Sequence, residues 1–354
     1  MMTHCLSKIV SRIDLTQSEA EQCMMEMLEG KTTDIQVAAL LSSLKVKGET
    51  VDELTGFARA MRQLSVKVKP RNLNNLVDTC GTGGDILKTF NVSTAAAIIA
   101  ASVGVKVAKH GNRSITSKCG GADILEALGV NLECGSSDVE RCLETVGIGF
   151  MFAPIFHPAL GRLMPVRREL NIATVFNLLG PLCSPAEASI QLLGVFEPSR
   201  IVMMARVLQN LGVKRAMVVH GFDEYNQPAM DEISTLGKTR IAFIDGSQMK
   251  VRDIYPEDIG IKRALREHIM ASDSLEENLR IIDNVLSGIT DNSADEARLN
   301  LCLANASAIL FLTGKTNDLR EGVELARRSV INGDAYSKMV ELVKTSNEHI
   351  KINN

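Results

Sequence analysis

Apolar residues recur with helical spacing over the first 65 residues of the chain. Val51, Leu54, Phe57, Ala58 and Met61 form one such stripe, three and four positions apart. This spacing places them on one face of an amphipathic helix, where they are expected to form core. The pattern predicts a small group of packed helices at this end of the chain.

Start and stop signals support these helices. Thr16, Thr33 and Thr50 are each followed three positions later by Glu or Gln. In this capping-box pattern the Thr hydroxyl and the Glu or Gln side chain satisfy free backbone amides reciprocally. Gly48 lies where the helix after Thr33 should end. We therefore predict a small, all-helical N-terminal domain over residues 1–70.

Beyond a polar linker containing proline, the pattern changes to short apolar runs that alternate with helical stretches. This alternation is typical of an α/β fold with a mostly parallel central sheet. The predicted strands are residues 76–80, 105–108, 130–132, 148–153, 190–195, 216–220 and 239–244. The predicted helices between them are residues 94–102, 122–128, 137–146, 157–169 and 199–211.

The last hundred residues are again predicted to be helical, at 275–286, 295–312, 319–331 and 335–343, with Gly288, Gly314 and Gly333 as stops. We predict a larger α/β domain with a helical C-terminus over residues 76–170 and 191–354. The segment 176–183, FNLLGPLC, interrupts the alternation of strands and helices. Residues 171–190 are therefore expected to return to the helical domain.

Composition limits the classes of function. The chain has 354 residues, 45% of them hydrophobic and 23% charged, with a formal net charge of −3. These values are typical of a globular protein, and the lack of a basic excess argues against nucleic acid as a partner. No apolar run approaches the roughly 18–20 residues of a membrane span. The N-terminus lacks the pattern of a signal peptide, so the cytoplasm is the expected location.

The eight cysteines are scattered, without a C-x-x-C pair or the spacing of a zinc site. They are expected to be reduced and mostly buried. Cys119 follows Lys118 in a glycine-flanked loop, which could favour its thiolate. An unreactive thiol is the preferred interpretation.

The loop after the first predicted strand contains three glycines within four positions, Gly81, Gly83 and Gly84. Their amides can converge on an anion, and the following helix N-terminus adds a favourable dipole. Hydroxyl groups that could bind phosphate or a metal follow at Thr89, Ser93 and Thr94. The loop matches neither G-x-G-x-x-G nor the Walker pattern, so a tight turn is an equally good interpretation.

A second polar loop follows the next predicted strand and carries Lys109, Arg113 and Lys118 within ten residues. Because the carboxyl ends of parallel strands share one edge of a sheet, the two loops should face each other there. This position favours anion binding over solvated surface charge. His110 in the same loop fits a structural or a catalytic role equally well.

Two further features could contribute ligands. Arg167, near the end of a predicted helix, could bind a carboxylate with its guanidinium fork, although helix-end charge is an alternative interpretation. Two acidic pairs, Asp223–Glu224 and Asp231–Glu232, both follow the strand at 216–220. Either pair suits Mg²⁺, and spacing does not choose between them.

Taken together, several of these stretches resemble the anthranilate phosphoribosyltransferase family over nearly the whole chain. The matching motifs are DTCGTGGD (78–85), KHGNRSITSK (109–118), VRREL (166–170), FNLLGPL (176–182) and DEIS (231–234). The resemblance implies the nucleoside-phosphorylase-like phosphoribosyltransferase fold and a homodimer formed through the helical domain. It also implies transfer of phosphoribose from phosphoribosyl pyrophosphate (PRPP) to the amine of anthranilate, a step of tryptophan biosynthesis.

The resemblance also implies roles for individual residues. PRPP would contact Gly81, Gly84, Asp85, Thr89, Asn91, Val92, Ser93, Thr94, Lys109, His110, Gly111, Asn112, Arg113, Ser114, Ile115, Thr116, Ser117 and Gly121. Anthranilate would contact Gly81, Asn112 and Arg167. Mg²⁺, expected as two ions shared with the pyrophosphate, would bind Ser93, Asp231 and Glu232. The family motif thereby selects Asp231–Glu232 over Asp223–Glu224, and no general acid or base is assigned.

The chain departs from the family pattern at three places. Ile86 replaces a common glycine, residues 222–230 lengthen the approach to Asp231, and Cys119 and Gly121 replace other small residues. None of these changes removes a candidate ligand. The alternative functions are those of a pyrimidine nucleoside phosphorylase and of a non-catalytic relative that binds nucleic acid. The motifs KHGN and VRREL fit the first poorly, and the net charge argues against the second.

Overall fold

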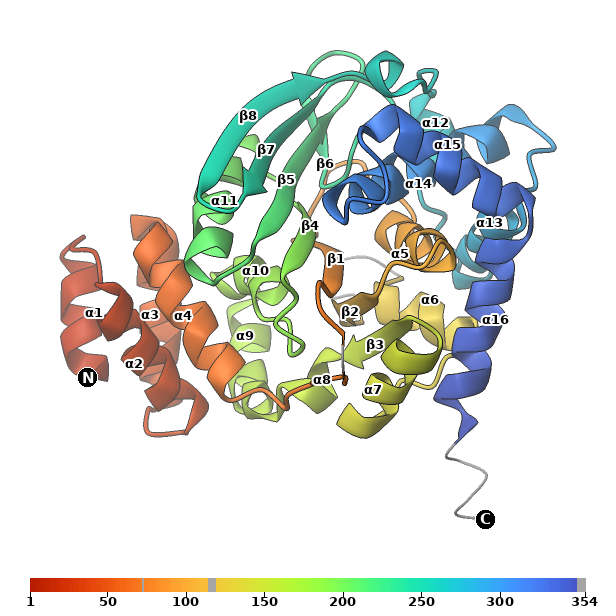
Figure 1. The fold of residues 1–354 in the computed structure, drawn as a ribbon. Coiled ribbons are helices and arrows are strands. Elements are labelled where there is room, and N and C mark those ends of the chain that lie inside the picture. The colour runs from red at the N-terminus through yellow and green to blue at the C-terminus, as the bar shows by residue number, and fades with distance from the viewer. Residues whose placement is uncertain (72, 114–118, 349–354) are drawn as a thin grey trace.

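Helices occupy the N-terminal end of the molecule, as the sequence predicts. The computed structural model describes residues 1–71, 73–113 and 119–348. Helices α1 (Met2–Val10), α2 (Gln17–Leu28), α3 (Asp34–Lys47) and α4 (Val51–Gln63) lie together beside the sheet (Figure 1). The three predicted capping boxes are confirmed. The hydroxyls of Thr16, Thr33 and Thr50 each accept from the backbone amide three residues later, and the Glu or Gln side chain at that later position accepts from the backbone amide of the Thr.

The centre of the molecule is a mixed sheet with the order β3-β2-β1-β4-β5-β7-β8, in which β6 pairs with β5. Its strands are β1 (Val77–Gly81), β2 (Val107–Gly111), β3 (Ile148–Phe152), β4 (Ile190–Gly194), β5 (Arg215–Phe222), β6 (Pro228–Met230), β7 (Thr239–Asp245) and β8 (Gln248–Ile254). Strands β1 to β5 pair parallel with one another, whereas β6 and β7 pair antiparallel with β5, and β8 pairs antiparallel with β7. The predicted α/β class with a mostly parallel sheet is confirmed.

Helices connect the strands and form the C-terminal part of the chain. Those of regular α form are α5 (Val92–Ser102), α6 (Gly121–Ala127), α7 (Ser136–Thr145), α8 (Ala153–Phe156), α9 (Met164–Leu170), α10 (Phe176–Leu179), α11 (Ile201–Asn210), α12 (Arg266–Ile269), α13 (Leu275–Ser287), α14 (Ser293–Leu312), α15 (Leu319–Ile331) and α16 (Asp334–Ser346). Short 3-10 helices are η1 (Pro158–Leu163), η2 (Gly180–Leu182), η3 (Pro198–Arg200) and η4 (Pro256–Ile259).

The two faces of the sheet belong to different hydrophobic cores. Because successive side chains of a strand point to opposite faces, Leu192 and Val219 join the core of α5 and α14. Their neighbours Leu193 and Val218 join the core that contains α11 and the N-terminal helices. The sheet therefore separates the blue C-terminal helices from the red and orange N-terminal ones in Figure 1.

The segment around α10 packs with the N-terminal helices. Phe176, Leu179 and Leu182 belong to the same buried core as Leu54 and Met61 of α4. This segment, which precedes β4 in the chain, therefore packs the α/β part of the molecule against the N-terminal helices. Phe176 and Gly180 of this segment also line a cavity.

Three predictions of local structure were wrong. Residues 130–132 form no strand; they are a buried connection whose Asn131 amide bonds Ser346 of α16 instead of a neighbouring strand. The predicted helix at 157–169 is divided into η1 and α9, which begin near Pro158 and Pro165 because proline favours the first turn of a helix. Strands β6 and β8 were missed, and β8 is an edge strand with mostly exposed side chains, which hides the alternation.

Within the ranges described above, no helix combines the length and the apolar character that crossing a bilayer requires.

Glu53 provides a stability test for the N-terminal helices. Its fully buried carboxylate accepts from Lys47 Nζ at 3.0 Å, from the Leu15 amide at 3.0 Å and from the Thr50 amide at 2.9 Å. Lys47 Nζ also pairs with the exposed Asp14 at 2.6 Å, so Glu53→Ala leaves the buried lysine with one exposed partner and leaves two amides without their acceptor. This loss should lower the free energy of unfolding by about 3 kcal/mol. Urea denaturation followed by circular dichroism measures this change.

Glu29→Ala is the matched control, because Glu29 pairs with Lys31 at the surface. An exposed ion pair contributes little, so the unfolding midpoint should not move. Equal effects of the two substitutions would contradict the role given to Glu53.

Candidate active site

The strand order changes direction beside β1, and this defines a crevice. Strands β2 and β3 follow β1 on one side, whereas β4 and β5 lie on its other side. In open parallel sheets, ligands bind outside the carboxyl ends of the strands where the order reverses. Here those ends are Gly81 of β1 and Gly194 of β4, which are paired in register.

Glycines at these strand ends make room for Asp231. A Cβ atom on Gly81 would lie 2.0 Å from Asp231 Oδ2, and one on Gly194 would lie 1.5 Å from the Asp231 carbonyl oxygen. The Gly83 amide donates to Asp231 Oδ2 at 2.9 Å. A Cβ on Gly221 of β5 would lie 2.7 Å from the Glu232 carbonyl oxygen. The Asp231–Glu232 segment therefore lies directly on the ends of three strands.

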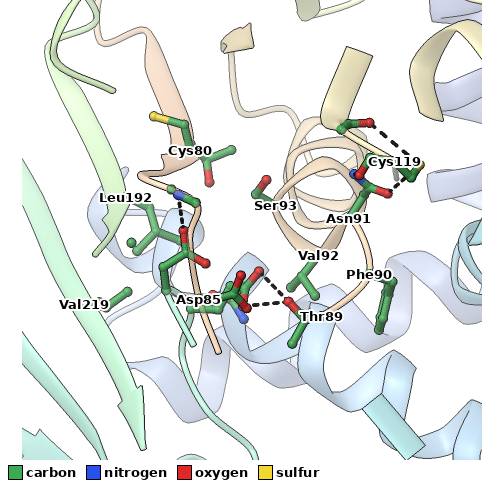
Figure 2. Close-up of a pocket in the computed structure, with 18 residues that line it drawn as sticks. Cys80, Asp85, Thr89, Phe90, Asn91, Val92, Ser93, Cys119, Leu192 and Val219 are labelled. Atoms are coloured by element: carbon green, nitrogen blue, oxygen red, sulfur yellow. Dashed lines mark hydrogen bonds between the residues drawn. The ribbon is translucent and has the colours of Figure 1, made fainter. Parts of the chain in front are cut away.

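A cavity of about 190 Å³, here called the acidic cavity, lies beside this segment (Figure 2). It is lined by Thr79, Cys80, Gly81, Gly83, Asp85, Thr89, Phe90, Asn91, Val92, Ser93, Cys119, Gly120, Leu192, Gly194, Val219, Asp231, Glu232 and Asn305. The glycine loop, the start of α5 and the segment after β6 thus contribute to one space.

Three carboxylates meet in the acidic cavity. Asp85, Asp231 and Glu232 each have an oxygen within 4.8 Å of the others. Burial, with repulsion from the neighbouring carboxylates, raises the pKa of Asp85 to about 7 and the pKa of Glu232 well above its usual value; burial also raises the pKa of Asp231. The Thr89 hydroxyl lies 3.0 and 2.9 Å from the two Glu232 oxygens (Figure 2). Oxygen ligands and crowded negative charge fit a hard divalent cation such as Mg²⁺.

The N-terminus of α5 faces the same cavity. Asn91, its N-cap residue, makes no capping bond; its side chain instead donates to the Cys119 carbonyl at 3.3 Å. The partial positive charge of the helix end is thus directed at a space that suits an anion. Behind it, the buried Lys109 donates to Ser93 Oγ at 3.2 Å and to the Thr79 carbonyl at 2.9 Å. Burial lowers the pKa of Lys109.

A second cavity, of about 220 Å³, adjoins the first and is here called the arginine cavity. It is lined by Met61, Cys80, Gly81, Thr82, His110, Gly111, Asn112, Ala153, His157, Leu160, Arg167, Phe176, Asn177, Gly180, Pro181 and Cys183. Cys80 and Gly81 belong to both cavities. The end of β1 is therefore the wall through which the two spaces meet.

Arg167 gives this second cavity its positive charge. Its guanidinium lies 4.8 Å from the ring centroid of Phe176, and burial lowers the pKa of Arg167. No carboxylate of the described ranges forms an ion pair with it. A half-buried guanidinium stacked on an aromatic ring is suited to a planar carboxylate ligand.

Two buried histidines lie in the arginine cavity. The His110 and His157 ring centroids are 5.1 Å apart, and the Nε2 atom of each is buried without a partner in the structure. Burial lowers the pKa of His110 to about 3 and that of His157 to about 4. Both imidazoles are therefore neutral at pH 7, so neither adds a second positive charge beside Arg167.

The structure brings most of the candidate residues to these cavities. The acidic cavity contains Gly81, Asp85, Thr89, Asn91, Val92, Ser93, Asp231 and Glu232, and the arginine cavity contains Gly81, His110, Gly111, Asn112 and Arg167. The candidates that do not line either cavity are Gly84, Thr94, Lys109, Arg113 and Gly121. Ser114, Ile115, Thr116 and Ser117 lie outside the described residues.

Arg113 points away from both cavities in this structure. Its guanidinium bonds Glu126 of α6 at 2.6 and 2.8 Å and Asp123 at 2.9 Å. Asp123 and Glu126 therefore bind the Arg113 side chain, which the sequence predicts to bind an anion. Contact between Arg113 and a ligand would require this exposed network to open.

The rival acidic pair has a different environment. Asp223 is buried and accepts from the amides of Tyr225 and Gln227, and it forms an ion pair with Arg266. These bonds organise the loop between β5 and β6. The Asp223 carboxylate is thus occupied within the protein, whereas Asp231 and Glu232 face the acidic cavity.

Several cavity residues were not singled out from the sequence. Gly194, His157, Phe176 and Asn305 are the clearest cases. Gly194 had a usable signal, because glycine in a strand often marks a close approach of another backbone. Phe176 lies in the motif FNLLGPL, which was expected to return to the helical domain and not to line the site, and His157 and Asn305 come from segments that are distant in sequence.

The thiol of Cys119 is not activated in the structure. Burial, with a smaller effect from Asp123, raises the pKa of Cys119 to about 11. Its Sγ lies 3.3 Å from Asn91 Oδ1. The preferred interpretation of an unreactive thiol therefore agrees with the structure.

The family models that match this chain are those of a transferase with a helical bundle domain and an a/b domain. Residues 3–65 match the helical bundle domain of a glycosyl transferase family, and residues 73–336 match the a/b domain of that family. The chain is 52% identical to an anthranilate phosphoribosyltransferase of Methanothermobacter marburgensis, over 94% of this chain and 95% of the relative. The chain therefore belongs to the anthranilate phosphoribosyltransferase family.

Solved structures of the family agree in fold. The anthranilate phosphoribosyltransferase of Thermus thermophilus has a TM-score of 0.88 and 38% identity, covering 97% of this chain and 99% of its own. The Saccharomyces cerevisiae enzyme in complex with PRPP and Mg has a TM-score of 0.86 and 27% identity, covering 98% of both chains. The same yeast enzyme in complex with 4-fluoroanthranilate has a TM-score of 0.86 and 26% identity, covering 98% and 97%.

Gly194→Ala tests the close contact between the end of β4 and the Asp231 backbone. The added methyl group would overlap the Asp231 backbone, so the substitution should destabilise the protein by about 1–3 kcal/mol through overpacking. Thermal unfolding measures this loss. Gly161→Ala is the control, because a Cβ there meets nothing within 4 Å. A Gly194 variant as stable as the Gly161 variant would contradict the close approach.

Proposed function

We propose that this chain transfers the phosphoribosyl group of PRPP to the amine of anthranilate, giving N-(5-phosphoribosyl)anthranilate and pyrophosphate in tryptophan biosynthesis. The observation that supports this function best is the pair of adjoining cavities of opposite character. One contains three carboxylates and a helix N-terminus, the other a half-buried arginine, and both include Gly81. A donor with a metal-bound pyrophosphate and an acceptor with a carboxylate fit these two spaces.

PRPP would bind on the side of the acidic cavity. Gly81, Asp85, Thr89 and Ser93 line that cavity, and the start of α5 adds its dipole. The remaining proposed contacts are Gly84, Asn91, Val92, Thr94, residues 109–117 and Gly121. Since the leaving pyrophosphate gains negative charge as its bond to ribose breaks, amides and dipoles directed at it would favour the transition state.

Ser93, Asp231 and Glu232 would hold Mg²⁺, and the position of Asp85 makes it a further ligand candidate. Two ions shared with the pyrophosphate are the proposed number. Bound Mg²⁺ would stabilise the negative charge on the leaving group. The Thr89 hydroxyl, at hydrogen-bond distance from Glu232, would keep that carboxylate oriented.

Anthranilate would bind in the arginine cavity, with its carboxylate on Arg167 and with Asn112 and Gly81 beside it. This orientation would direct the amine toward the shared wall, and so toward the ribose carbon of the donor. The aromatic amine is neutral at pH 7 and needs no activation before it attacks. No general acid or base is therefore assigned, in keeping with the neutral state of His110 and His157.

We also propose the division into a helical domain of residues 1–70 with 171–190 and an α/β domain of residues 76–170 and 191–354. The shared core of the N-terminal helices and α10 supports it. A homodimer formed through the helical domain is supported by three exposed apolar side chains, Val10 at 64%, Ile13 at 53% and Val46 at 76% exposure. A cytoplasmic location is supported by eight free cysteines, which suit a reducing compartment.

The decisive experiment follows the loss of anthranilate fluorescence. Fluorescence should fall when PRPP and Mg²⁺ are both present and stay constant when either is omitted. Phosphorolysis of thymidine or uridine, and binding to DNA at physiological salt, should both be absent. Phosphorolysis or DNA binding without any consumption of anthranilate would overturn the proposed function.

Arg167→Ala tests the acceptor site. Without the guanidinium the anthranilate carboxylate loses its partner, so the KM for anthranilate should rise by about tenfold or more, while the KM for PRPP changes little. Arg168→Ala is the matched control, because Arg168 is exposed and lines neither cavity. A selective rise in the KM for PRPP would contradict the assignment.

The paired substitution Asp231→Asn with Glu232→Gln tests the metal site. It keeps the size of both side chains but removes their charge, so Mg²⁺-dependent turnover should be lost. Asp223→Asn with Glu224→Gln should weaken the loop that Arg266 holds, yet leave the dependence of rate on Mg²⁺ concentration unchanged. If the Asp223–Glu224 variant shifts the Mg²⁺ dependence more strongly, the choice of ligands is wrong.

A further inference from the structure

Four consecutive residues, 180–183, form one wall of the arginine cavity. Gly180, Pro181 and Cys183 line the cavity, whereas the Leu182 side chain is buried in the core behind it. Residues 180–182 form η2, with Cys183 as its C-cap, and this helix is too short to hold its own position by internal hydrogen bonds. Its place must be set by the groups that bind its carbonyls.

The sheet holds this wall from one side. Gln191 of β4 is 1% exposed, and its Nε2 donates to the Pro181 carbonyl at 2.6 Å. Its backbone is fixed between β1 and β5 by the register of β4. The Pro181 carbonyl is therefore tied to a rigid part of the α/β domain.

The N-terminal helices hold the wall from the other side, through Arg62 at the end of α4. Its Nε donates to the Leu182 carbonyl at 2.7 Å, and its Nη1 donates to the carbonyl of Leu211, the C-cap residue of α11, at 3.2 Å. The preceding residue, Met61, lines the arginine cavity and contacts Cys183, with Sγ and Sδ 3.6 Å apart. Two successive carbonyls are thus bound from opposite sides.

The environment of Arg62 is unusual for a buried charge. Arg62 is 9% exposed and burial lowers its pKa, yet no carboxylate of the described ranges forms an ion pair with it. A buried guanidinium is costly unless hydrogen bonds compensate it. Carbonyl oxygens provide that compensation here, including one at the negative end of the α11 dipole. Displacing Leu182 would leave the charge less well satisfied, so Arg62 resists movement of the wall.

We propose that Arg62 is a positioning residue for the acceptor, which fixes the 180–183 wall of the arginine cavity by joining it to α4 and α11. This inference rests on the proposed function, because the arginine cavity is there assigned to anthranilate. Arg62 lines neither the acidic nor the arginine cavity, and its hydrogen bonds reach no residue of the glycine loop. Its effect should therefore fall on the acceptor and spare the donor.

The test compares Arg62→Met with Arg62→Lys and with Arg59→Met. Methionine removes the buried charge with little loss of volume, whereas lysine retains the charge and can reach a single carbonyl. Arg59 is the matched control, since it lies one turn earlier on α4, is exposed, and donates to the Asn210 carbonyl at 3.2 Å. Each variant is measured for both KM values and for hydrogen–deuterium exchange of the amides in 176–183 and 81–94.

For Arg62→Met we expect a rise of about tenfold in the KM for anthranilate and less than about twofold in the KM for PRPP. Exchange should become faster in 176–183 and stay unchanged in 81–94. The KM for anthranilate and the exchange rate of 176–183 in Arg62→Lys should lie between those of Arg62→Met and those of the unaltered protein. Both values in Arg59→Met should equal those of the unaltered protein. If Arg62→Met does not fold, the same two KM values and exchange rates are compared between Arg62→Lys and Arg59→Met.

The outcomes separate this inference from the proposed function. A lack of anthranilate turnover in the unaltered protein would refute the proposed function, and the exchange of 176–183 would then decide alone whether Arg62 fixes the wall. Unchanged exchange in this segment, or equal rises in both KM values, would overturn the inference. Faster exchange without a change in the KM for anthranilate would also overturn it, because the wall would then not position the acceptor.

Discussion

The site depends on one steric constraint, the close approach of Asp231 to two strand ends, with its carboxylate against Gly81 and its backbone against Gly194. Gly81 and Gly194 lie side by side in register, and any side chain at either position would overlap Asp231. This close approach brings carboxylates from the segment after β6 over the crevice between β1 and β4. A glycine loop and a helix N-terminus already meet at that crevice. Three segments that are distant in sequence thereby form one cavity.

A second property of the site is the separation of charge across a single wall. Negative charge is concentrated on one side of Gly81, where the carboxylates repel each other, and Arg167 lies on the other side. The neutral imidazoles of His110 and His157 leave Arg167 as the dominant charge of its cavity. Met61, Phe176 and Cys183 of the arginine cavity belong to the hydrophobic core that contains the N-terminal helices. The shape of this cavity therefore depends on how the N-terminal helices sit against the sheet.

Much of the fold could be predicted from local patterns. The helices that begin at Thr16, Thr33 and Thr50 have caps that act within one turn, so the sequence alone specifies them. The parallel strands were found for a similar reason, as short apolar runs between helices. The prediction failed where tertiary contacts replaced local ones. The apolar run at 130–132 is buried without strand pairing because its polar groups bond to α16.

The sequence by itself determined the class of fold, the motifs of the family and a part of the residues that line the two cavities, because these follow from residue type and short spacing. The tertiary structure decided what those side chains contact. It turned Arg113 toward the acids of α6, buried Lys109 behind Ser93, and added Asp85 to the carboxylates of the acidic cavity. Such contacts join segments ten or more residues apart, and only the packed backbone fixes the distances between them.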